Sequence, residues 1–444
     1  MLGIEGQIIL VSFLAAVLLW IIKPAGGTYT IGLLAVFLGG TIAGFEMADL
    51  AVGFVNPSLW LLIAAMFLGH ALLKTGLGKR LVILLLSKFK PSYFSIIIGW
   101  VIIGIAFSFL TPSITVRFLI IVPIAVSIAD ACGMEAGSRG RSLTVISAWV
   151  AALLPGITLL NGSLYGPAFT AFLPRGAIAE MATAGNWFKI IGPPFLLMAL
   201  ILLVAVCLVL RPEEKLKIAK ADMIKMYRDL GPATKDERNC MMVFAIILAG
   251  LAITGPTGFT TSQILMFGFF LLLLSGVLKI PDISTGISWD VILFFGVLMG
   301  FSHIFEISGV SAWISPALES LVIPLTKDPL IFAIGLYVLC SVLRLVDLTQ
   351  SWITASILSL LTPVLYSDFG YHPLVCLAIF IFSGNHFLFR YNQPWLPQVE
   401  SLVGTGGWSV SHLRKVAIMY ALLSFPILAA SVPYWRFIGA IRVV

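Results

Sequence analysis

Long apolar segments separated by short polar ones run along the whole chain, and this pattern predicts an all-α integral membrane protein. A helix needs about 20 apolar residues to cross the hydrocarbon core of a bilayer. The first apolar segment has no charged region before it and no cleavage-like site, so we interpret it as a span and not as a signal peptide. The candidate segments are 7–23, 29–45, 58–74, 92–131, 143–180, 187–210, 240–254, 262–278, 290–308, 329–366, 373–399 and 413–440.

Two segments in each half are too long for one crossing and contain polar interruptions, namely 92–131 and 143–180, then 329–366 and 373–399. Non-helical backbone inside a bilayer must be buried in protein or line a wet cavity, because unpaired amides are costly in lipid. The pattern therefore predicts one re-entrant hairpin and one discontinuous helix in each half.

The longest charged stretch, 211–239, divides the chain almost at its midpoint. It carries eight Lys/Arg and six Asp/Glu residues. Its basic residues predict a cytoplasmic location, which Arg139 and Arg141 would share. We interpret it as a solvated linker between a first repeat, 1–210, and a second repeat, 240–444.

The two halves resemble each other at matching positions, which indicates a duplication. The spacing between the matches grows slowly from 232 to 240 positions. The matches are Pro24 with Pro256, Gly44 with Gly276, His70 with His303, Thr111 with Thr349, and Pro123 with Pro363. Each half then holds five crossings and one re-entrant hairpin, and because five is odd, the second half runs inverted. Inverted repeats are frequent in secondary transporters, which bind substrate where the repeats meet.

Composition agrees with a membrane protein and excludes several other classes. Hydrophobic residues make up 60% of the 444 residues and charged residues 11%, whereas soluble domains carry about 25% charged residues. The net charge of +7 lies mainly between apolar segments, so we expect no nucleic acid partner. The five cysteines show no metal-binding spacing and are expected to be free. The chain has no P-loop, HExxH or GxSxG motif, so we expect neither an enzyme nor a requirement for an ATPase subunit.

The first hairpin tip is predicted at Thr111–Thr115, with the sequence TPSIT. Pro112 ends or kinks a helix because it lacks an amide donor. Ser113 is placed to cap the next helix, whose free amides then point at the site. The same reasoning places the second tip at 349–354, with Ser351 and Thr354. Paired kinked helices without a ligand are the alternative interpretation.

The second broken segment of each half is rich in Gly, Asn and Pro, which mark irregular backbone. These loops lie at 154–163, with Thr158 and Asn161, and at 383–394, with Asn385 and Asn392. Their carbonyl and amide oxygens are hard ligands, suited to an alkali cation or to water.

Ionisable residues inside the membrane are candidate functional groups. Arg117 follows the first tip, and we expect it to contact an anionic substrate or to form an internal ion pair. Arg344 and Asp347 are three residues apart and are expected to pair with each other. Arg390 either faces the cavity or reaches the interface.

The intramembrane histidines divide into two kinds. His70 and His303 occupy matching positions near the ends of their spans, where packing or interfacial hydrogen bonding is expected. A protonation role is conceivable for His386, in the second broken loop.

The sequence as a whole resembles the divalent anion:sodium symporter family, within the ion transporter superfamily that includes citrate, sulfate and arsenite permeases. The resemblance rests on a span ending in GHALLKTGL, a tip with Ser-x-Thr, Pro123 ten residues after Ser113, and the stretch SGNHFLFRYNQPWLPQVESLVGTGGWS. It covers nearly the whole chain. Members usually have one more N-terminal span, so we expect ten crossings with both termini on the outer face.

The resemblance implies specific roles for residues at the tips and broken loops. The family's Ser-Asn-Thr signature contacts substrate carboxylate and helps to form sodium sites; here it falls on Ser113 and Thr115, and on Ser351 and Thr354, without either Asn. By this resemblance, the substrate site would comprise Ser113, Thr115, Arg117, Asn161, Ser351, Thr354, Asn385, Arg390 and Asn392. Sodium, the only cofactor implied, would bind Ser113, Thr158, Asn161, Ser351 and Asn385. Arg117 departs from the family pattern and is a candidate fixed cation in place of sodium, which would favour exchange or proton coupling.

The expected function is secondary transport of a small, divalent anion such as a dicarboxylate, sulfate or sulfonate. The family resemblance implies a homodimer in the cell membrane, of the bacterial inner membrane type, with an elevator mechanism. A cation/proton antiporter or a metalloid oxyanion permease is the alternative, with Asp347 as its essential carboxylate. A membrane-embedded enzyme would need a cluster of acids, bases or metal ligands, which the sequence does not supply.

Overall fold

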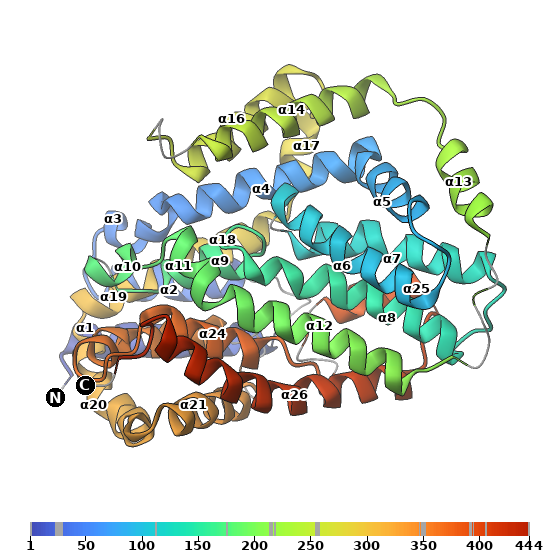
Figure 1. Cartoon of the computed structure of the whole chain (residues 1–444). Coiled ribbons are helices and arrows are strands. Elements are labelled where there is room, and N and C mark those ends of the chain that lie inside the picture. The colour runs from blue at the N-terminus through green and yellow to red at the C-terminus, as the bar shows by residue number, and fades with distance from the viewer. Residues whose placement is uncertain are drawn as a thin grey trace.

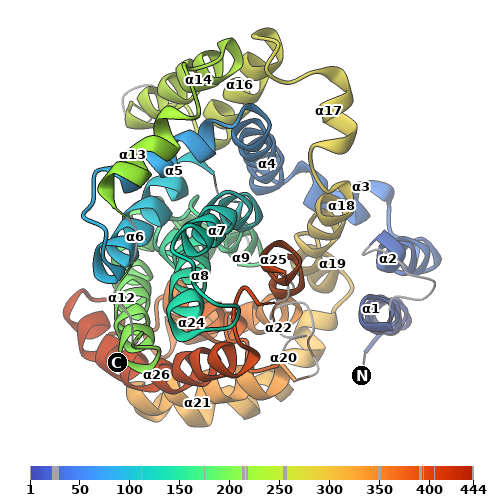
Figure 2. The ribbon, with the colours of Figure 1, turned by 90° about the vertical axis from the view of Figure 1, so that its right-hand side faces the viewer.

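The chain folds into a bundle of helices, many of them short or interrupted (Figures 1 and 2). The computed structural model describes residues 2–22, 30–111, 113–174, 176–212, 216, 219–253, 258–345, 347, 352–389, 393, 395–404 and 406–442. Within these ranges, a single bridge between Tyr371 and Ile441 is the only β pairing. Seven helical stretches among them are long and apolar enough to cross a membrane. The predicted all-α membrane fold is confirmed.

The first half, up to the charged linker, is a run of helices. Its two predicted breaks lie between residues 110 and 114 and after residue 153. In chain order the helices are α1 (Ile4–Ile22), α2 (Thr30–Ile42), α3 (Met47–Leu50), η2 (Val52–Val55), α4 (Pro57–Thr75), α5 (Leu77–Ser87), α6 (Tyr93–Leu110), α7 (Ile114–Ala131), α8 (Arg139–Leu153), η3 (Pro155–Thr158), α9 (Tyr165–Ala171), α10 (Ala177–Glu180), α11 (Ala184–Ile190) and α12 (Gly192–Val209).

The linker helix α13 (Lys220–Arg228) leads into the second half, which also contains long, short and broken helices. These are α14 (Lys235–Ala252), α16 (Thr261–Leu274), α17 (Ile280–Thr285), α18 (Trp289–Leu298), α19 (Phe301–Ile307), α20 (Val310–Val322), η4 (Ile323–Lys327), α21 (Pro329–Leu343), α22 (Trp352–Leu358), η5 (Ser359–Leu361), α23 (Thr362–Ser367), α24 (Pro373–Gly384), α25 (Leu396–Val403) and α26 (Val410–Phe437).

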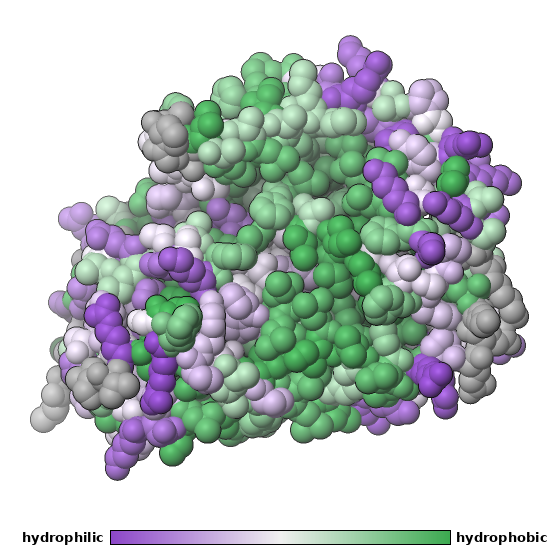
Figure 3. Space-filling model, viewed as in Figure 1, coloured by the Kyte–Doolittle hydropathy of each residue, from purple (hydrophilic) through white to green (hydrophobic). Residues whose placement is uncertain are grey.

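The surface of the bundle shows a broad apolar region between two hydrophilic ends (Figure 3). Exposed leucine and valine side chains of α12, such as Leu197, Leu200 and Val204, contribute to this apolar surface. Such a surface suits contact with lipid tails and not with water. Both chain ends lie at one end of the molecule, opposite the linker helix α13 (Figure 1).

Helices α8 and α24 lie at the centre of the bundle (Figure 2). Nearly every residue of α8 is buried, and so is every residue of α24. Burial on every side places both helices in the interior of the bundle and not at its surface. Both end in irregular backbone, where α8 gives way to the 3-10 turn of η3 and α24 ends at Asn385.

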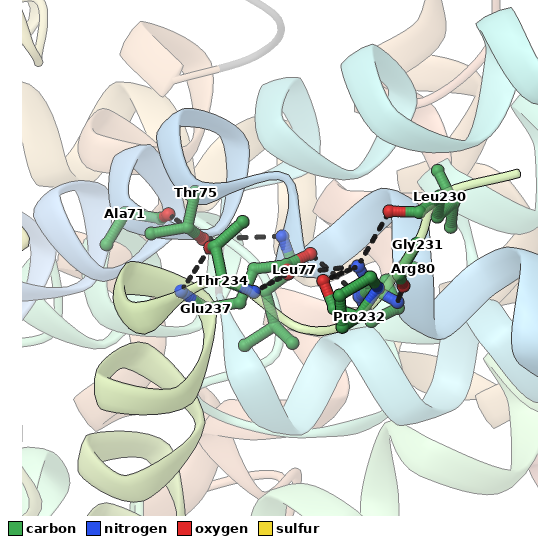
Figure 4. Close-up of polar contacts among 9 residues, drawn as sticks. All are labelled: Ala71, Thr75, Leu77, Arg80, Leu230, Gly231, Pro232, Thr234 and Glu237. Atoms are coloured by element: carbon green, nitrogen blue, oxygen red, sulfur yellow. Dashed lines mark hydrogen bonds and ion pairs between the residues drawn. The ribbon is translucent and has the colours of Figure 1, made fainter.

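The end of the linker is fixed to the first half by Arg80 of α5 (Figure 4). The Nε and Nη2 atoms of Arg80 donate to the two carboxylate oxygens of Glu237 at 2.8 and 3.0 Å. Its Nη1 atom donates to the Gly231 carbonyl at 2.9 Å. Thr234 and Glu237 form a reciprocal capping box that begins α14, an arrangement that satisfies free amides at a helix start. The predicted solvated linker is therefore anchored at its second end, where a buried ion pair joins α5 to α14.

Candidate functional site

A cavity of about 520 Å³ lies between α4, α17 and α18 on one side and α7, α22 and α25 on the other. Its size is within the usual range for small-molecule sites, about 300–1,000 Å³. The residues that line it are Met66, His70, Leu73, Ser113, Thr115, Val116, Leu119, Leu164, Thr285, Gly286, Ile287, Ser288, Val291, Phe294, Phe295, Trp352, Trp395 and Gln398. The first tip, at Ser113 and Thr115, thus borders a cavity that both halves of the chain form.

Ser113 is the N-cap of α7, as the sequence predicts. Its Oγ accepts from the Val116 amide at 3.3 Å, and its own amide donates to Thr111 Oγ1 at 3.1 Å. These contacts fix the turn and leave the start of an 18-residue helix at the cavity. The free amides and the dipole of a helix start favour a bound anion. Thr115 lies in the first turn of the same helix and also lines the cavity.

Arg117 is fully buried and does not line the cavity. Its Nε donates to the Ala152 carbonyl at 2.8 Å. Its Nη1 donates to the Ser108 hydroxyl, the Thr111 carbonyl and the Gly162 carbonyl. Neither expectation for this residue, contact with substrate or an internal ion pair, matches this geometry, because the guanidinium is held by oxygens of the first hairpin, of the end of α8 and of the first broken loop.

Two glycines make room for that guanidinium. A Cβ atom at Gly156 would collide with both terminal nitrogens of Arg117 and with the Gly162 carbonyl. In turn, a Cβ at Gly162 would collide with the Gly156 carbonyl. The close approach of backbone to a charged group is a position where only glycine fits. Arg117 thus explains the glycine at position 156, and the close approach of Gly156 in turn explains Gly162.

The second tip is built around Asp347. Its Oδ2 accepts from the amide and the hydroxyl of Thr354 at 2.9 and 2.7 Å. Arg344, which is fully buried, donates from Nη1 to the Asp347 carbonyl. This bond goes to the backbone of Asp347, so the expected pairing of the two charged side chains stays a prediction. The Thr354 hydroxyl donates to the Asp347 carboxylate. Ser351 lies outside the described residues.

The other predicted ligands are spread over the two broken loops. Thr158 is buried and donates to the Pro155 carbonyl at 2.7 Å. Asn161 is half-buried and lines neither this cavity nor the second one. Asn385 is fully buried and donates from Nδ2 to the Ile381 carbonyl at 2.9 Å. Arg390 and Asn392 lie outside the described residues.

Aromatic residues of the cavity were not among the predicted site residues. Trp352 and Trp395 line it from the second half, opposite Phe294 and Phe295 of α18. Trp352 falls inside the predicted second tip, at the place where the resembled family has Asn. Its position in the sequence was therefore a reason to expect it at the site. Trp395 follows the second broken loop, and nothing in its local sequence distinguishes it from a packing residue.

Two histidines bind carboxylates of the opposite half. His70 of α4 lies 3.3 Å from Asp282 of α17, between Nε2 and Oδ1, and Lys74 lies 2.5 Å from the same carboxylate. His303 of α19 lies 2.9 Å from Asp49 of α3. Burial raises the pKa of Asp282, but hydrogen bonds from Lys74, the Lys279 amide and His70 outweigh this and lower it to about 2. The expected interfacial hydrogen bonding of both histidines is present.

A second cavity of about 290 Å³ lies near the other end of α4. Asn56, which caps the start of α4, lines it together with His303 and Ser302, whereas the first cavity borders His70 near the helix end. The Phe172 carbonyl accepts from Ser302 at 3.0 Å and from Ser359 at 2.8 Å. These bonds tie α19 to the segment after α9 beside the smaller cavity.

Comparison with known proteins gives a consistent result. A family model described as the sodium:sulfate symporter transmembrane region matches residues 2–441. A putative malate transporter of Bacillus subtilis, YflS, is 26% identical over 322 residues, which cover 69% of this chain and 66% of the relative. A chloroplastic dicarboxylate transporter of Spinacia oleracea is 26% identical over 306 residues, which cover 66% of this chain and 52% of that one. The matches thus span less than two thirds of either relative.

A solved structure has the same fold over nearly the whole chain. The YdaH transporter of Alcanivorax borkumensis aligns with a TM-score of 0.60 and 15% identity, covering 98% of both chains. That transporter is described as having an unusual topology. At this identity the likeness establishes the fold.

Proposed function

The chain belongs to the sodium:sulfate symporter family, and from this premise we propose that it is a secondary active transporter of a small, divalent anion such as a dicarboxylate, sulfate or sulfonate. The family and its relatives are transporters and not enzymes, and the chain is a multi-pass membrane protein that transports anions. The relatives named for malate and dicarboxylates favour organic acids among these substrates.

The observation that carries this proposal is the position of Ser113. It caps α7 at the edge of a cavity that Thr115 also lines. A helix start with a polar cap binds a carboxylate or sulfonate through amides and hydroxyls, without a buried counter-charge at the contact. The inward-pointing helix starts of broken helices serve the same purpose in other secondary transporters.

We further propose that residues 1–210 and 240–444 are inverted repeats joined by a cytoplasmic linker, 211–239. Two reciprocal His–Asp contacts between the halves support this proposal. Asp282 lies 233 positions after Asp49, and His303 lies 233 positions after His70, so each His binds the Asp of the other repeat. A twofold relationship between the repeats generates such reciprocal pairs.

In the elevator mechanism that we propose, α6–α9 and α21–α25 form the mobile unit, and α1–α5 with α14–α20 form the scaffold, within a homodimer. The two cavities at opposite ends of α4 support this assignment, because the mobile and fixed parts meet at both. Rigid movement of one unit along the other would enlarge one cavity while closing the other.

Arg117 bears on the coupling ion. A sodium ion at the first tip would need oxygens such as the Thr111 and Gly162 carbonyls and the Ser108 hydroxyl, and the guanidinium already uses these. The residues therefore do not fit a sodium ion at this place. We propose that Arg117 supplies the fixed positive charge, and that transport is sodium-independent, by exchange or with protons.

The test is uptake into liposomes that contain the purified protein. Labelled dicarboxylate, sulfate and sulfonate are offered with sodium or with choline as the only external cation, and with or without unlabelled anion inside. Uptake of an anion in choline, accelerated by internal anion, supports exchange. Strict dependence on sodium overturns the role of Arg117, and absence of uptake for every anion, from either side, overturns anion transport.

The alternative of a cation/proton antiporter or oxyanion permease depends on a carboxylate that is free to exchange its ligand. Asp347, the candidate from the sequence, accepts two hydrogen bonds from Thr354. These contacts are those of a residue that shapes the second tip. Full activity of Asp347→Asn in anion uptake would agree with this structural role.

A further inference from the structure

The scaffold helix α4 meets the first tip directly at Gly69. A Cβ atom at Gly69 would collide with the Val116 side chain and with the Thr111 hydroxyl, and such a close approach of two segments requires glycine. The next residue of α4, His70, lines the larger cavity together with Val116 and Ser113. His70 therefore lies on the scaffold side of this cavity, next to the place where α4 contacts the tip.

The ring of His70 is held in place by α17. Its Nε2 atom lies 3.3 Å from Asp282 Oδ1. A Cβ atom at Gly286 would collide with Cδ2 of His70, which places this part of the ring against the end of α17. The Nδ1 atom lies across the ring from these two atoms, and no hydrogen-bond partner for it is found in the part of the chain that the structure describes. One edge of the ring is thus fixed by the scaffold, and the other can meet a ligand in the cavity.

The charges next to His70 allow this ring to attract an anion. Asp282 is ionised at neutral pH, because its pKa is lowered to about 2. Lys74 lies 2.5 Å from the same carboxylate and balances its charge, so a proton on His70 leaves the group of three with one net positive charge. A protonated imidazole donates from both ring nitrogens. Its Nδ1 atom can then donate to an acid group in the cavity while Nε2 donates to Asp282.

The other titratable groups on the elements that pack against α4, or face it across the cavity, do not line the cavity. Those that are buried or half-buried are Arg80, Arg117, Tyr165, Glu237, Cys240, Asp290 and Glu400. The remaining charged residues of these elements are exposed to solvent. Among the described lining residues, His70 is therefore the group whose charge can change near neutral pH.

The smaller cavity contains the corresponding group from the second half. His303 lines it, and its Nε2 atom lies 2.9 Å from Asp49. Each cavity thus has one histidine that is held by an aspartate of the opposite half of the chain. A mobile unit that carries an anion from one cavity to the other would bring it to such a histidine at both ends of the movement.

We propose that His70 and His303 are substrate-contacting residues of the scaffold, one for each face of the membrane. Each donates, in its protonated form, to the second acid group of a dianion whose first acid group lies at Ser113. The proposal rests on the anion transport and the movement proposed above, and names what recognises the second charge. Because the histidines belong to the scaffold, their protons stay on their own face, so protonation tunes the affinity for the anion and is not transported with it.

The experiment measures exchange from each face of the membrane, since each histidine meets the anion on one face only. Right-side-out and inverted membrane vesicles that contain the full chain are loaded with saturating succinate, and kcat/KM is determined for external succinate. External succinamate, which has the same length but a neutral amide in place of one acid group, is measured in parallel.

A hydrogen bond to a charged group is worth about tenfold in affinity. His70→Gln should therefore lower kcat/KM for succinate about tenfold from one face, and His303→Gln should do so from the other, whereas the values for succinamate should change less than about twofold. His412→Gln is the matched control, because its ring contacts the Ser142 hydroxyl and lines neither cavity. Unchanged succinate values, equal losses from both faces, or equal losses for both anions overturn the proposal.

The pH dependence of the wild-type chain gives a readout that needs no variant. Between about pH 6.5 and about pH 8.5, succinate keeps both charges while histidine loses its proton. Raising the pH on both sides over this range should lower kcat/KM for succinate by about fivefold, and a flat profile overturns the proposal even if a variant does not fold. Changing the internal pH alone should have no effect, and a stimulation would show that the proton moves with the anion, which also overturns it. Absence of succinate exchange in wild-type vesicles would instead count against anion transport itself.

Discussion

His303 binds Asp49 across 254 positions of the chain, with 2.9 Å between Nε2 and Oδ1. The reverse contact, from His70 to Asp282, joins the corresponding positions of the two halves. His70 lies near the end of α4, and His303 lies on α19. Asp49 lies in the short helix α3, which precedes α4, and Asp282 lies in the short helix α17, which precedes α18 and α19. The two halves of the chain are thus joined by the same contact twice.

Replacing Asp282 by Asn should lower the free energy of unfolding by about 1 kcal/mol at pH 7, because the carboxylate binds Lys74 and His70. The pKa of Asp282 is lowered to about 2 in the folded protein, against about 3.9 when unfolded. The contribution of this carboxylate to the free energy of unfolding is therefore complete above about pH 4 and is lost as the pH falls towards 2.

Thermal unfolding measured across this pH range should show the stabilities of wild type and Asp282→Asn converging at low pH. The control Glu135→Gln, at an exposed position, should match wild type throughout. A constant difference at all pH values would contradict the prediction.

Removing the guanidinium of Arg117 should abolish uptake in sodium-free medium. Arg117→Ala leaves the Ala152 and Gly162 carbonyls without their donor, and a buried polar group without a partner costs about 1–3 kcal/mol. Arg117→Lys keeps the charge and should retain part of the uptake. The measurement is initial uptake in liposomes, scaled to the amount of folded protein by size-exclusion chromatography. Equal uptake by Arg117→Ala and wild type would disprove the fixed-cation role.

Gly156→Ala should disturb the same site without changing any charge. The added Cβ meets the guanidinium of Arg117 and the Gly162 carbonyl, and overpacking of this kind costs about 1–3 kcal/mol. We expect reduced uptake and a lower Tm. Gly185→Ala is the control, because a Cβ there meets only Thr183, at 4.0 Å. The same loss in both variants would point to a general effect of alanine and not to the guanidinium.

Arg80→Met should destabilise the scaffold by about 3 kcal/mol, because it leaves the Glu237 carboxylate buried without its partner. The double variant Arg80→Met with Glu237→Leu should recover part of that loss, since no charge then remains unpaired. Thermal unfolding measures the stability, and limited proteolysis in 211–234 reports release of the linker. Additive losses in the double variant would show that the two side chains act independently.

Movement between the two units can be tested at the smaller cavity, where Ser302 and Ala171 both lie in the lining. With cysteine at both positions, oxidation should cross-link the scaffold to the mobile unit and stop uptake, and reduction should restore it. Each single cysteine variant is the control. Of the native cysteines, four are buried and Cys207 is half-buried. Full uptake by the cross-linked protein would exclude the proposed movement.

The sequence alone determined the membrane class, the family resemblance, the two broken segments in each half and the cap at Ser113. These features depend on local physical rules, such as the length needed to span a bilayer and the backbone restrictions of Pro and Gly. It also supported the match of His70 with His303, because that match is a spacing along the chain. It did not indicate the aspartates, which lie more than 200 positions away from the histidines they bind.

The tertiary structure decided where the charges and rings lie. Arg117 was expected at the substrate or in an ion pair. Instead it donates to carbonyls of α8 and of the loop that follows, 35 and 45 positions later, because the direction of a long side chain depends on what packs around it. Along the chain, nothing distinguishes Trp395 from an ordinary packing residue, and it lines a cavity together with Trp352 only because α22, α25 and α18 meet in the fold. Sequence patterns specify which segments enter the membrane, whereas the contents of a site depend on contacts between segments that no local rule relates.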